Sequence, residues 1–416
     1  MFSTFRKHAA RRTASLLALL LPVLLSSCGS SEVESSVEPS KTSDGTPPSN
    51  VPSVGSPATD GGGTSPVTEG GVPLPPCDDA ETAALQKSFD AAHPSDTDAV
   101  LVVRTACGVR FFTSGPSKYP ATTLHRIASN TKTYVASLVL LLAEDGVIGL
   151  DSPASQWVEG VPGGTAIKVR HLLRHDSGLY DYTNSVLLEG RNEKVWTPRE
   201  LADISFKHKV EFAPGEGWSY SNSNYVVLGM IAEKATGKPV EVLIRERILG
   251  PIGATATFFE GKEALPTQLA VGRDALGRDI TNINHPSQYW CAGSLVATPG
   301  DLALWVEARG SGKFHSAKVN AELEQTLPTS ATKDYRYGLG VMVFGPDATR
   351  GAGPGYGHGG DLFGYHSWGL YFPESKTTVA LVIDSDKGTK GVFPFASSNS
   401  RDLLYATLDT LFGKKK

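Results

Sequence analysis

Three short groups of residues have the types and spacing that nucleophilic catalysis requires, and the first is Ser129-Asn130-Thr131-Lys132. An apolar helix is expected over 129–143, so Lys132 lies one turn from Ser129 on the same face. The helix dipole favours negative charge on a serine at the helix N-terminus. A lysine held against an apolar core has a lowered pKa and can accept the serine proton. The plainer alternative is that Ser129 only caps the helix and Lys132 is a surface lysine.

The second group is Tyr220-Ser221-Asn222. A tyrosine poised between phenol and phenolate can transfer a proton, and an asparagine beside it can hydrogen-bond a substrate amide. The alternative is a turn rich in Ser and Asn that caps the next helix.

The third group is His358-Gly359-Gly360, which precedes a β-rich segment. Glycines here let a substrate lie along a strand edge, and a backbone N–H from this edge can complete an oxyanion hole with that of Ser129. The run 355–360 matches GxGxxG but does not open a helix, so we reject a dinucleotide site. The absence of GxSxG from the sequence disfavours an α/β-hydrolase, and the absence of CxxC and HExxH gives no indication of a metal site.

The elements that must position these groups alternate between helix and strand patterns. Strands are expected near both ends of the body of the chain, with helices between them, which predicts an α+β fold: an antiparallel sheet flanked by helices, with an inserted mainly helical lobe. The sheet lobe is expected at about 77–125 and 290–416, and the helical lobe at about 126–289. The expected helices are 78–93, 129–143, 224–235, 239–249 and 401–412, and the expected strands are 99–103, 109–113, 338–344, 365–372 and 378–383.

Taken in order, Ser-x-x-Lys, Tyr-x-Asn and His-x-Gly resemble the serine β-lactamase and D-alanyl-D-alanine carboxypeptidase family. The flanking sequences agree with this resemblance. Residues 172–182 resemble that family's LLxHxSGL loop, and residues 292–302 resemble a family strand and the start of the helix that follows it. The segments 337–340 and 358–364 complete the match. The resemblance runs from about 80 to 412 and implies a β-lactamase/transpeptidase-like fold.

The resemblance also implies roles for individual residues. Ser129 would be the acylated nucleophile, Lys132 its proton acceptor and Tyr220 the general acid and base. Asn222 would bind the acyl amide, and His358 would stand for the usual strand lysine or histidine of the catalytic set. Gly359, Gly360 and Asp361 would bind substrate, with the N–H groups of Ser129 and Asp361 as the oxyanion hole. No metal or cofactor is implied. The other histidines that we considered are expected to be structural: His125, His171, His175, His208, His285 and His366.

The resemblance predicts an acyl-serine hydrolase of small-molecule or peptide substrates, most of all D-alanyl-D-alanine-type peptides. An esterase or a β-lactamase of the same family stays open, as does a non-catalytic tethered sensor of β-lactams or cell wall. Similar carboxypeptidases grip a terminal carboxylate with hydroxyl residues where this chain has Gly359 and Asp361, and with a basic residue where it has Met342. An acidic Asp361 would repel a carboxylate.

The N-terminal segment is expected to be an export signal followed by a membrane tether. Four basic residues precede an apolar run from Ala14 to Leu25, which is shorter than a bilayer span, so 1–27 is predicted to be a signal peptide. The run ends at Leu25-Ser26-Ser27-Cys28, which resembles a lipoprotein lipobox with Cys28 lipidated. In 29–76, Ser, Pro, Gly and Thr make up 32 of 48 residues, a composition typical of a disordered linker.

Composition and cysteine content limit the remaining possibilities. The full chain is 40% hydrophobic, so the unit 77–416 can bury a substantial core, and the chain's net charge of −4 argues against a nucleic-acid binder. We expect an exported protein anchored to a membrane by its lipid, on the periplasmic or cell-surface side, of unknown oligomeric state. In that compartment Cys77 and Cys107 are candidates for a disulfide, which leaves Cys291 as a buried thiol.

Overall fold

The structure is a computed structural model that describes residues 77–186, 193–323, 325–329, 333–387 and 398–413. The predicted signal peptide, the lipidation site at Cys28 and the linker up to residue 76 lie outside the described residues.

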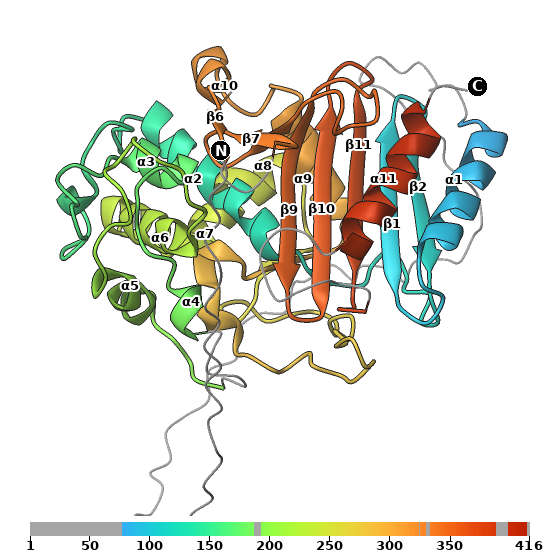
Figure 1. The fold of residues 1–416 in the computed structure, drawn as a ribbon, viewed down its shortest axis with the longest axis horizontal. Helices are drawn as coiled ribbons and strands as arrows, with labels where there is room; N and C mark the ends of the chain where they lie inside the picture. The colour runs from blue at the N-terminus through green and yellow to red at the C-terminus, as the bar shows by residue number, and fades with distance from the viewer. Residues whose placement is uncertain (1–76, 187–192, 324, 330–332, 388–397, 414–416) are drawn as a thin grey trace, which may run out of the picture. The chain divides into compact units, whose positions relative to one another are not determined.

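The centre of the fold is an eight-stranded antiparallel sheet with the strand order β2-β1-β11-β10-β9-β8-β7-β6 (Figure 1). Strands from the two ends of the chain meet in it, because β1 pairs with β11 with Val102 opposite Ala380. On the other side of β11, β10 pairs with β9, with Trp368 opposite Gly359. The strands are β1 (Ala99–Thr105), β2 (Gly108–Ser114), β6 (Leu327–Pro328), β7 (Tyr335–Tyr337), β8 (Met342–Phe344), β9 (Gly355–Leu362), β10 (Tyr365–Phe372) and β11 (Thr377–Ile383).

Both faces of this sheet are covered, so its central strands are apolar on both sides. In β1, Leu101 and Val103 belong to the core under α1 (Asp79–Ala92) and α11 (Ser398–Phe412). The alternate residues Val100 and Val102 belong to the larger core that includes α9 (Pro299–Gly310). Side chains alternate across a strand, so each β1 residue joins one core or the other. Figure 1 shows α1 and α11 in front of the sheet and α9 behind it.

The helical lobe shares this larger core. Its central helix α2 (Thr131–Glu144) is buried at nearly every position and packs against α6 (Asn222–Thr236). A small antiparallel sheet with the order β3-β5-β4 joins three distant segments beside it. Within the described residues, no helix combines the length and the apolar character needed to cross a membrane. The remaining elements are β3 (His125–Arg126), α3 (Val169–Arg174), α4 (Thr183–Val186), α5 (Pro198–Phe206), α7 (Val240–Ile244), α8 (Gly250–Ile252), β4 (Thr257–Phe259), β5 (Leu295–Ala297) and α10 (Ala317–Leu323).

The predicted elements are found within a few residues of their expected ends, with two exceptions. The helix expected over 239–249 is α-helical only to Ile244 and continues as a π-helical segment over Arg245–Leu249. The strand expected over 338–344 is wrong in its first half, because β7 ends at Tyr337 and β8 begins only at Met342. Between them Gly338 donates to the Val341 carbonyl in a tight turn. Gly340 in that turn has a φ of +74°, which a strand residue does not adopt.

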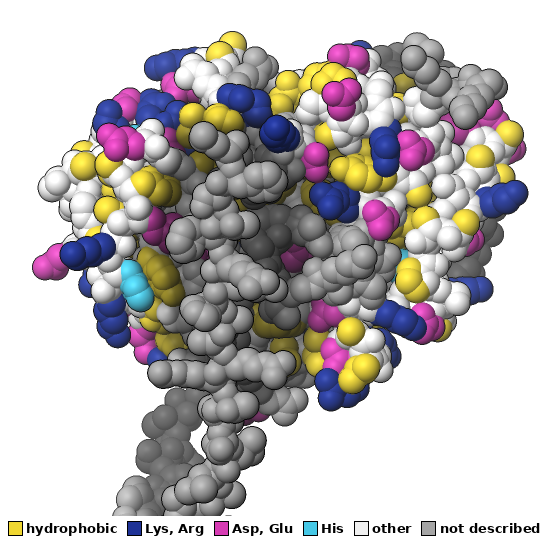
Figure 2. Space-filling model, viewed as in Figure 1, with side chains coloured by type: hydrophobic (Ala, Val, Ile, Leu, Met, Phe, Trp, Pro, Cys, Tyr) yellow, Lys and Arg dark blue, Asp and Glu magenta, His cyan; other side chains and the backbone are white. Residues whose placement is uncertain are grey.

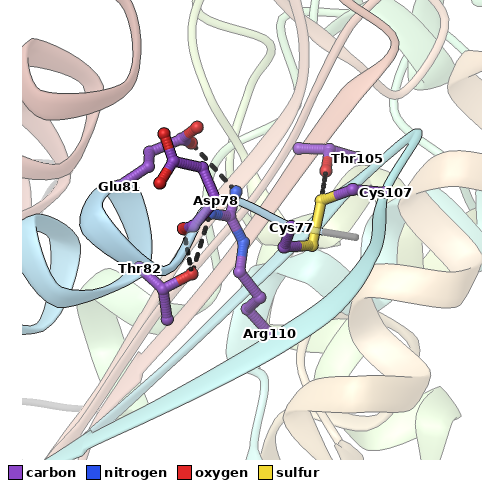
Figure 3. The surroundings of a disulfide bond; sticks show 7 residues. All are labelled: Cys77, Asp78, Glu81, Thr82, Thr105, Cys107 and Arg110. Carbon is purple, nitrogen blue, oxygen red and sulfur yellow. Dashed lines mark hydrogen bonds and ion pairs between the residues drawn. A yellow bond between two sulfur atoms is a disulfide. The ribbon is translucent and has the colours of Figure 1, made fainter. Parts of the chain in front are cut away.

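Cys77 and Cys107 form a disulfide that ties the start of α1 to the turn between β1 and β2 (Figure 3). Arg110 on β2 reinforces this junction through an ion pair of 3.1 Å with Glu81 of α1. The remaining thiol, Cys291, is buried. Its sulfur lies against Gly229 of α6, in the helical lobe.

Charged side chains of both signs are interspersed over the coloured parts of the face seen in Figure 2. This mixed distribution accords with the small net charge of −4.

Candidate active site

Ser129 sits on a short turn (Ala128–Asn130) directly before α2. Ala128 has a φ of +49°, a left-handed conformation that costs a non-glycine residue about 1 kcal/mol or more. Ser367 on β10 fixes the turn through two hydrogen bonds. Its hydroxyl donates to the Ile127 carbonyl over 2.8 Å and accepts from the Asn130 side chain over 2.9 Å. Ala128 and Asn130 are buried while Ser129 stays partly exposed. The strained turn therefore presents the Ser129 hydroxyl at a fixed position.

Lys132 has the geometry of a proton acceptor for that hydroxyl. Its Nζ lies 2.9 Å from Ser129 Oγ and 2.6 Å from the Ala292 carbonyl oxygen, and the side chain is fully buried. Burial lowers the pKa of Lys132 to about 7, although the negative charge of Asp181 opposes the shift. Near neutral pH a large fraction of Lys132 is thus the free amine, which can take a proton from Ser129.

Tyr220 lies beside Lys132, whose Nζ is 4.9 Å from the centre of the tyrosine ring. Burial raises the pKa of Tyr220 well above its usual value, and a hydrogen bond with Ser129 offsets only part of this shift. Tyr220 is therefore a neutral phenol at physiological pH, and its hydroxyl is a proton donor beside the nucleophile. Its ring stacks on that of His175, with the centroids 4.2 Å apart.

Asn222 is the first residue of α6, and a neighbouring loop holds its side chain. Its Nδ2 donates to Asp181 Oδ2 over 3.0 Å and to Thr183 Oγ1 over 3.3 Å. Because the amide nitrogen is engaged in this way, the side-chain oxygen is the atom that can accept an N–H from a substrate.

His358 lies beside the site but is not exposed to it, since its side chain is fully buried on β9. Its Nε2 lies 2.9 Å from the Tyr337 hydroxyl, and its Nδ1 contacts the Gly359 carbonyl oxygen. Burial, together with the positive charge of Lys132, lowers the pKa of His358 to about 3, so the ring is neutral. We expected a catalytic group here. In the structure the ring is neutral and enclosed, and its two nitrogens contact Tyr337 and Gly359; its catalytic role stays a prediction.

A buried hydrogen-bonded chain continues from His358 to the back of the site. Nδ1 of His175 accepts from the Ser221 backbone N–H over 3.2 Å and lies 3.1 Å from Nδ2 of Asn224, so its proton is on Nε2. That Nε2 lies 3.3 Å from the Tyr337 hydroxyl, which in turn donates to His358. The chain His175–Tyr337–His358 supports Tyr220 from one end and β9 from the other.

Strand β9 runs directly past the nucleophile turn at the three residues that we expected to bind substrate. A Cβ on Gly360 would lie 2.5 Å from the Ile127 carbonyl oxygen and 3.0 Å from Ala128 Cβ, so only glycine allows this approach. A Cβ on Gly359 would lie 2.9 Å from the Trp368 ring on the other face. Asp361 follows, and its carboxylate pairs with His366. The backbone N–H groups of Ser129 and Asp361 therefore belong to adjoining segments.

Comparison with known proteins agrees with this geometry. The family model described as Beta-lactamase matches residues 97–394. The chain belongs to the beta-lactamase family. The expected beta-lactamase/transpeptidase-like fold is thereby confirmed, and the protein is a serine hydrolase of that family.

Individual relatives differ in what they cover. D-amino acid amidase from Ochrobactrum anthropi SV3 is 27% identical, with a TM-score of 0.73 over 80% of this chain and 99% of that one. A D-stereospecific amidohydrolase from Streptomyces is 28% identical, with a TM-score of 0.68 over 78% of this chain and 98% of that one. Penicillin-binding protein 4* of Bacillus subtilis is 32% identical over 148 residues, 35% of this chain. The match spans only 33% of that relative's length.

The sequence predicted that Ser129, Lys132 and Tyr220 lie in the site, but it did not predict the contribution of three further residues. Asp181 accepts a hydrogen bond from the Asn222 side chain, and its negative charge raises the pKa of Lys132 against the effect of burial. His175 and Tyr337 form the buried chain behind them. All three residues lie within the motif segments 172–182 and 337–340, which were used only to recognise the family.

Proposed function

We propose that this beta-lactamase family hydrolase cleaves amide or peptide bonds that follow a D-amino acid, through an acyl-enzyme on Ser129. The observation that carries the proposal is the 2.9 Å contact between Lys132 Nζ and Ser129 Oγ, together with the lowering of the Lys132 pKa to about 7 by burial. A base with this pKa, in contact with the nucleophile, suits proton transfer near neutral pH.

In the proposed reaction, Ser129 Oγ attacks the substrate carbonyl carbon and its proton passes to Lys132 Nζ. Backbone N–H groups of Ser129 and Asp361 stabilise the oxyanion. The Tyr220 hydroxyl then protonates the leaving nitrogen as the C–N bond breaks and the acyl-serine ester forms. Tyr220 regains its proton from Lys132, and water, activated by the same pair, later hydrolyses the ester. The Asn222 side-chain oxygen accepts an N–H from the acyl part throughout.

The preference for D-amino acids is supported by the names of the similar proteins, a D-amino acid amidase and a D-stereospecific amidohydrolase. The same nucleophile would also serve an esterase or a β-lactamase. A tethered sensor that acylates without turnover belongs to another class, and the test separates it from the enzymes.

The test is acylation of the full-length protein by a fluorophosphonate and by penicillin, followed by mass spectrometry, with Ser129→Ala as the control. We expect an adduct on Ser129 and none on the variant. Hydrolysis of acyl-D-alanyl-D-alanine, acyl-D-alanine amide and their L-isomers then tests the substrate. Turnover of the D-forms supports the proposal, whereas turnover of simple esters alone assigns an esterase, and a stable adduct without turnover of any substrate assigns a sensor.

We also propose that Cys28 carries a lipid that anchors the enzyme to a membrane, with 29–76 as a flexible spacer. Two features of the sequence support this proposal: the lipobox-like sequence Leu25–Cys28 after the apolar run, and the segment rich in Ser, Pro, Gly and Thr that follows it. Fractionation of cells that express the wild type or Cys28→Ala tests this. Release of the variant from the membrane fraction is expected, and equal membrane retention of both proteins would disprove the anchor.

A further inference from the structure

The wall of the site formed by β9 has none of the features that would hold a carboxylate. His358 is neutral and enclosed. Gly359 offers no hydroxyl, and the Trp368 ring leaves no room for one. Met342, on the neighbouring β8, is fully buried and uncharged.

The next residue along this wall, Asp361, carries a negative charge that the fold holds in place. His366 lies directly opposite it on β10, and the two side chains form an ion pair of 2.7 Å. The second ring nitrogen of His366 lies 3.1 Å from Asp386. Burial lowers the pKa of His366, but its hydrogen bonds to the two carboxylates outweigh this and raise it to about 9. Two carboxylates and one imidazolium leave the group Asp361–His366–Asp386 with a net charge of −1.

The backbone of β9 at Asp361 adjoins the nucleophile turn. Gly360, the residue before Asp361, is packed against Ile127 and Ala128, which immediately precede Ser129. The Asp361 side chain is 19% exposed, so it is open to a ligand, whereas that of His366 is only 7% exposed. A substrate held against Ser129 along β9 is therefore closer to the Asp361 carboxylate than to the His366 imidazolium that partly neutralises it.

We propose that Asp361 is a specificity-determining residue that excludes substrates with a carboxylate beside the scissile bond and selects those with a neutral or cationic group there. The substrate class is then D-aminoacyl amides, esters, and peptides that continue or are amidated beyond the cleaved bond. Substrates that end in a free carboxylate, such as D-alanyl-D-alanine stem peptides, are disfavoured. This inference rests on the proposed function and narrows its substrate.

The test uses two thioesters of N-acetyl-D-alanine that differ in one group, the thioglycolate with its free carboxylate and the corresponding thioglycolamide. Thioesters need only acyl-serine chemistry, so they report on Asp361 even if the enzyme does not cleave peptide bonds. The measured quantity is kcat/KM for the amide form divided by that for the carboxylate form. We expect a ratio of about 10 or more for the wild type, from one unit charge at short range in a partly exposed site.

Asp361→Asn keeps the size of the side chain and removes its charge, so it should lower the ratio at least about fivefold. The matched control is Asp347→Asn, which removes one charge from an exposed loop residue and should leave the ratio unchanged. Covalent labelling of Ser129 by a neutral fluorophosphonate, at any rate, shows that each variant is folded.

The outcomes are separable. A ratio near 1 in the wild type, or an equal ratio in wild type and Asp361→Asn, overturns the role of Asp361. If Asp361→Asn is not labelled, Asp361→Ser, which restores the hydroxyl of related carboxypeptidases, takes its place with the same expected fall. Failure to cleave any D-peptide or D-amide while the thioester ratios behave as expected would refute the proposed function but not this inference.

Discussion

The hydroxyl of Tyr337 lies 2.9 Å from Nε2 of His358 and donates to it, because the ring's proton is on Nδ1, against the Gly359 carbonyl oxygen. The same hydroxyl lies 3.3 Å from Nε2 of His175, whose ring stacks on Tyr220. One phenol on β7 therefore links the strand that lines the site to the tyrosine beside the nucleophile. It does so without adding charge, since burial lowers the pKa values of both imidazoles.

Tyr337→Phe should weaken both the fold and the catalytic geometry. The substitution leaves two buried imidazole nitrogens without a partner, which should lower the free energy of unfolding by about 2–4 kcal/mol. Loss of this support for Tyr220 should slow fluorophosphonate labelling of Ser129 by about tenfold. Chemical denaturation and labelling kinetics measure the two effects.

The matched control for this substitution is Tyr335→Phe, two residues earlier on the same strand. Tyr335 is also buried, but its hydroxyl has no hydrogen-bond partner among the described residues. Removing it should change the free energy of unfolding and the labelling rate little. Equal effects of the two substitutions would mean that the chain of hydrogen bonds has no role beyond packing.

The acylation rate should depend on the protonation state of Lys132. Its pKa is lowered to about 7 by burial, and the deprotonated amine is the active form, so the rate should rise as pH rises through 7. From about pH 6 to about pH 8 the deprotonated fraction, and with it kcat/KM, should increase about tenfold. A pH profile of kcat/KM on an uncharged D-aminoacyl ester measures this rise.

Asp181→Asn should move that rise to lower pH. The negative charge of Asp181 favours protonated Lys132 and so raises the lysine pKa against the effect of burial. With this charge removed the amine loses its proton more readily, and the midpoint of the profile should fall by about half a pH unit or more. A midpoint that stays in place or moves upward would show that Lys132 is not the group titrating.

Gly360→Ala tests how closely β9 must approach the nucleophile turn. Its new Cβ would lie 2.5 Å from the Ile127 carbonyl oxygen and 2.6 Å from Ser367 Oγ, so the strand or the turn must move. We expect a loss of about 1–3 kcal/mol of stability and a larger proportional loss of acylation rate. Gly345→Ala is the control, because a Cβ there meets no atom within 4 Å. Full activity of Gly360→Ala would show that the turn tolerates a wider spacing.

The sequence was sufficient to predict the strands β1, β2, β10 and β11, the main helices and the nucleophile pair, because each has a local pattern. The glycine-rich strand β9, which lines the site, was not among the expected strands. Lys132 is the fourth residue of the helix expected over 129–143 and directly precedes its apolar part, so its burial and its contact with Ser129 could be predicted together. The state of His358 could not, since it depends on Tyr337 and on the depth of β9 in the fold. The pairing of Asp361 with His366 likewise depends on the register of β9 with β10, which the sequence leaves undefined.

The Cys77–Cys107 disulfide should stabilise the fold without affecting catalysis. It closes a separation of 30 residues and joins α1 to the β1–β2 turn, at the edge of the sheet where β2 is the last strand. By chain entropy its loss should cost about 3–4 kcal/mol, which for a unit of this size lowers Tm by about 5 °C. A double variant with Cys77→Ser and Cys107→Ser should reproduce the Tm of the reduced wild type and respond no further to reductant. Cys291→Ala should keep the response, because its thiol is not in the disulfide.

Since the edge strand lies four strands from β9 in the sheet order, the Ser129 labelling rate at 25 °C should be the same with and without the disulfide. A reductant-insensitive Tm in the wild type would contradict the pairing, and a slower labelling rate would contradict its separation from the site.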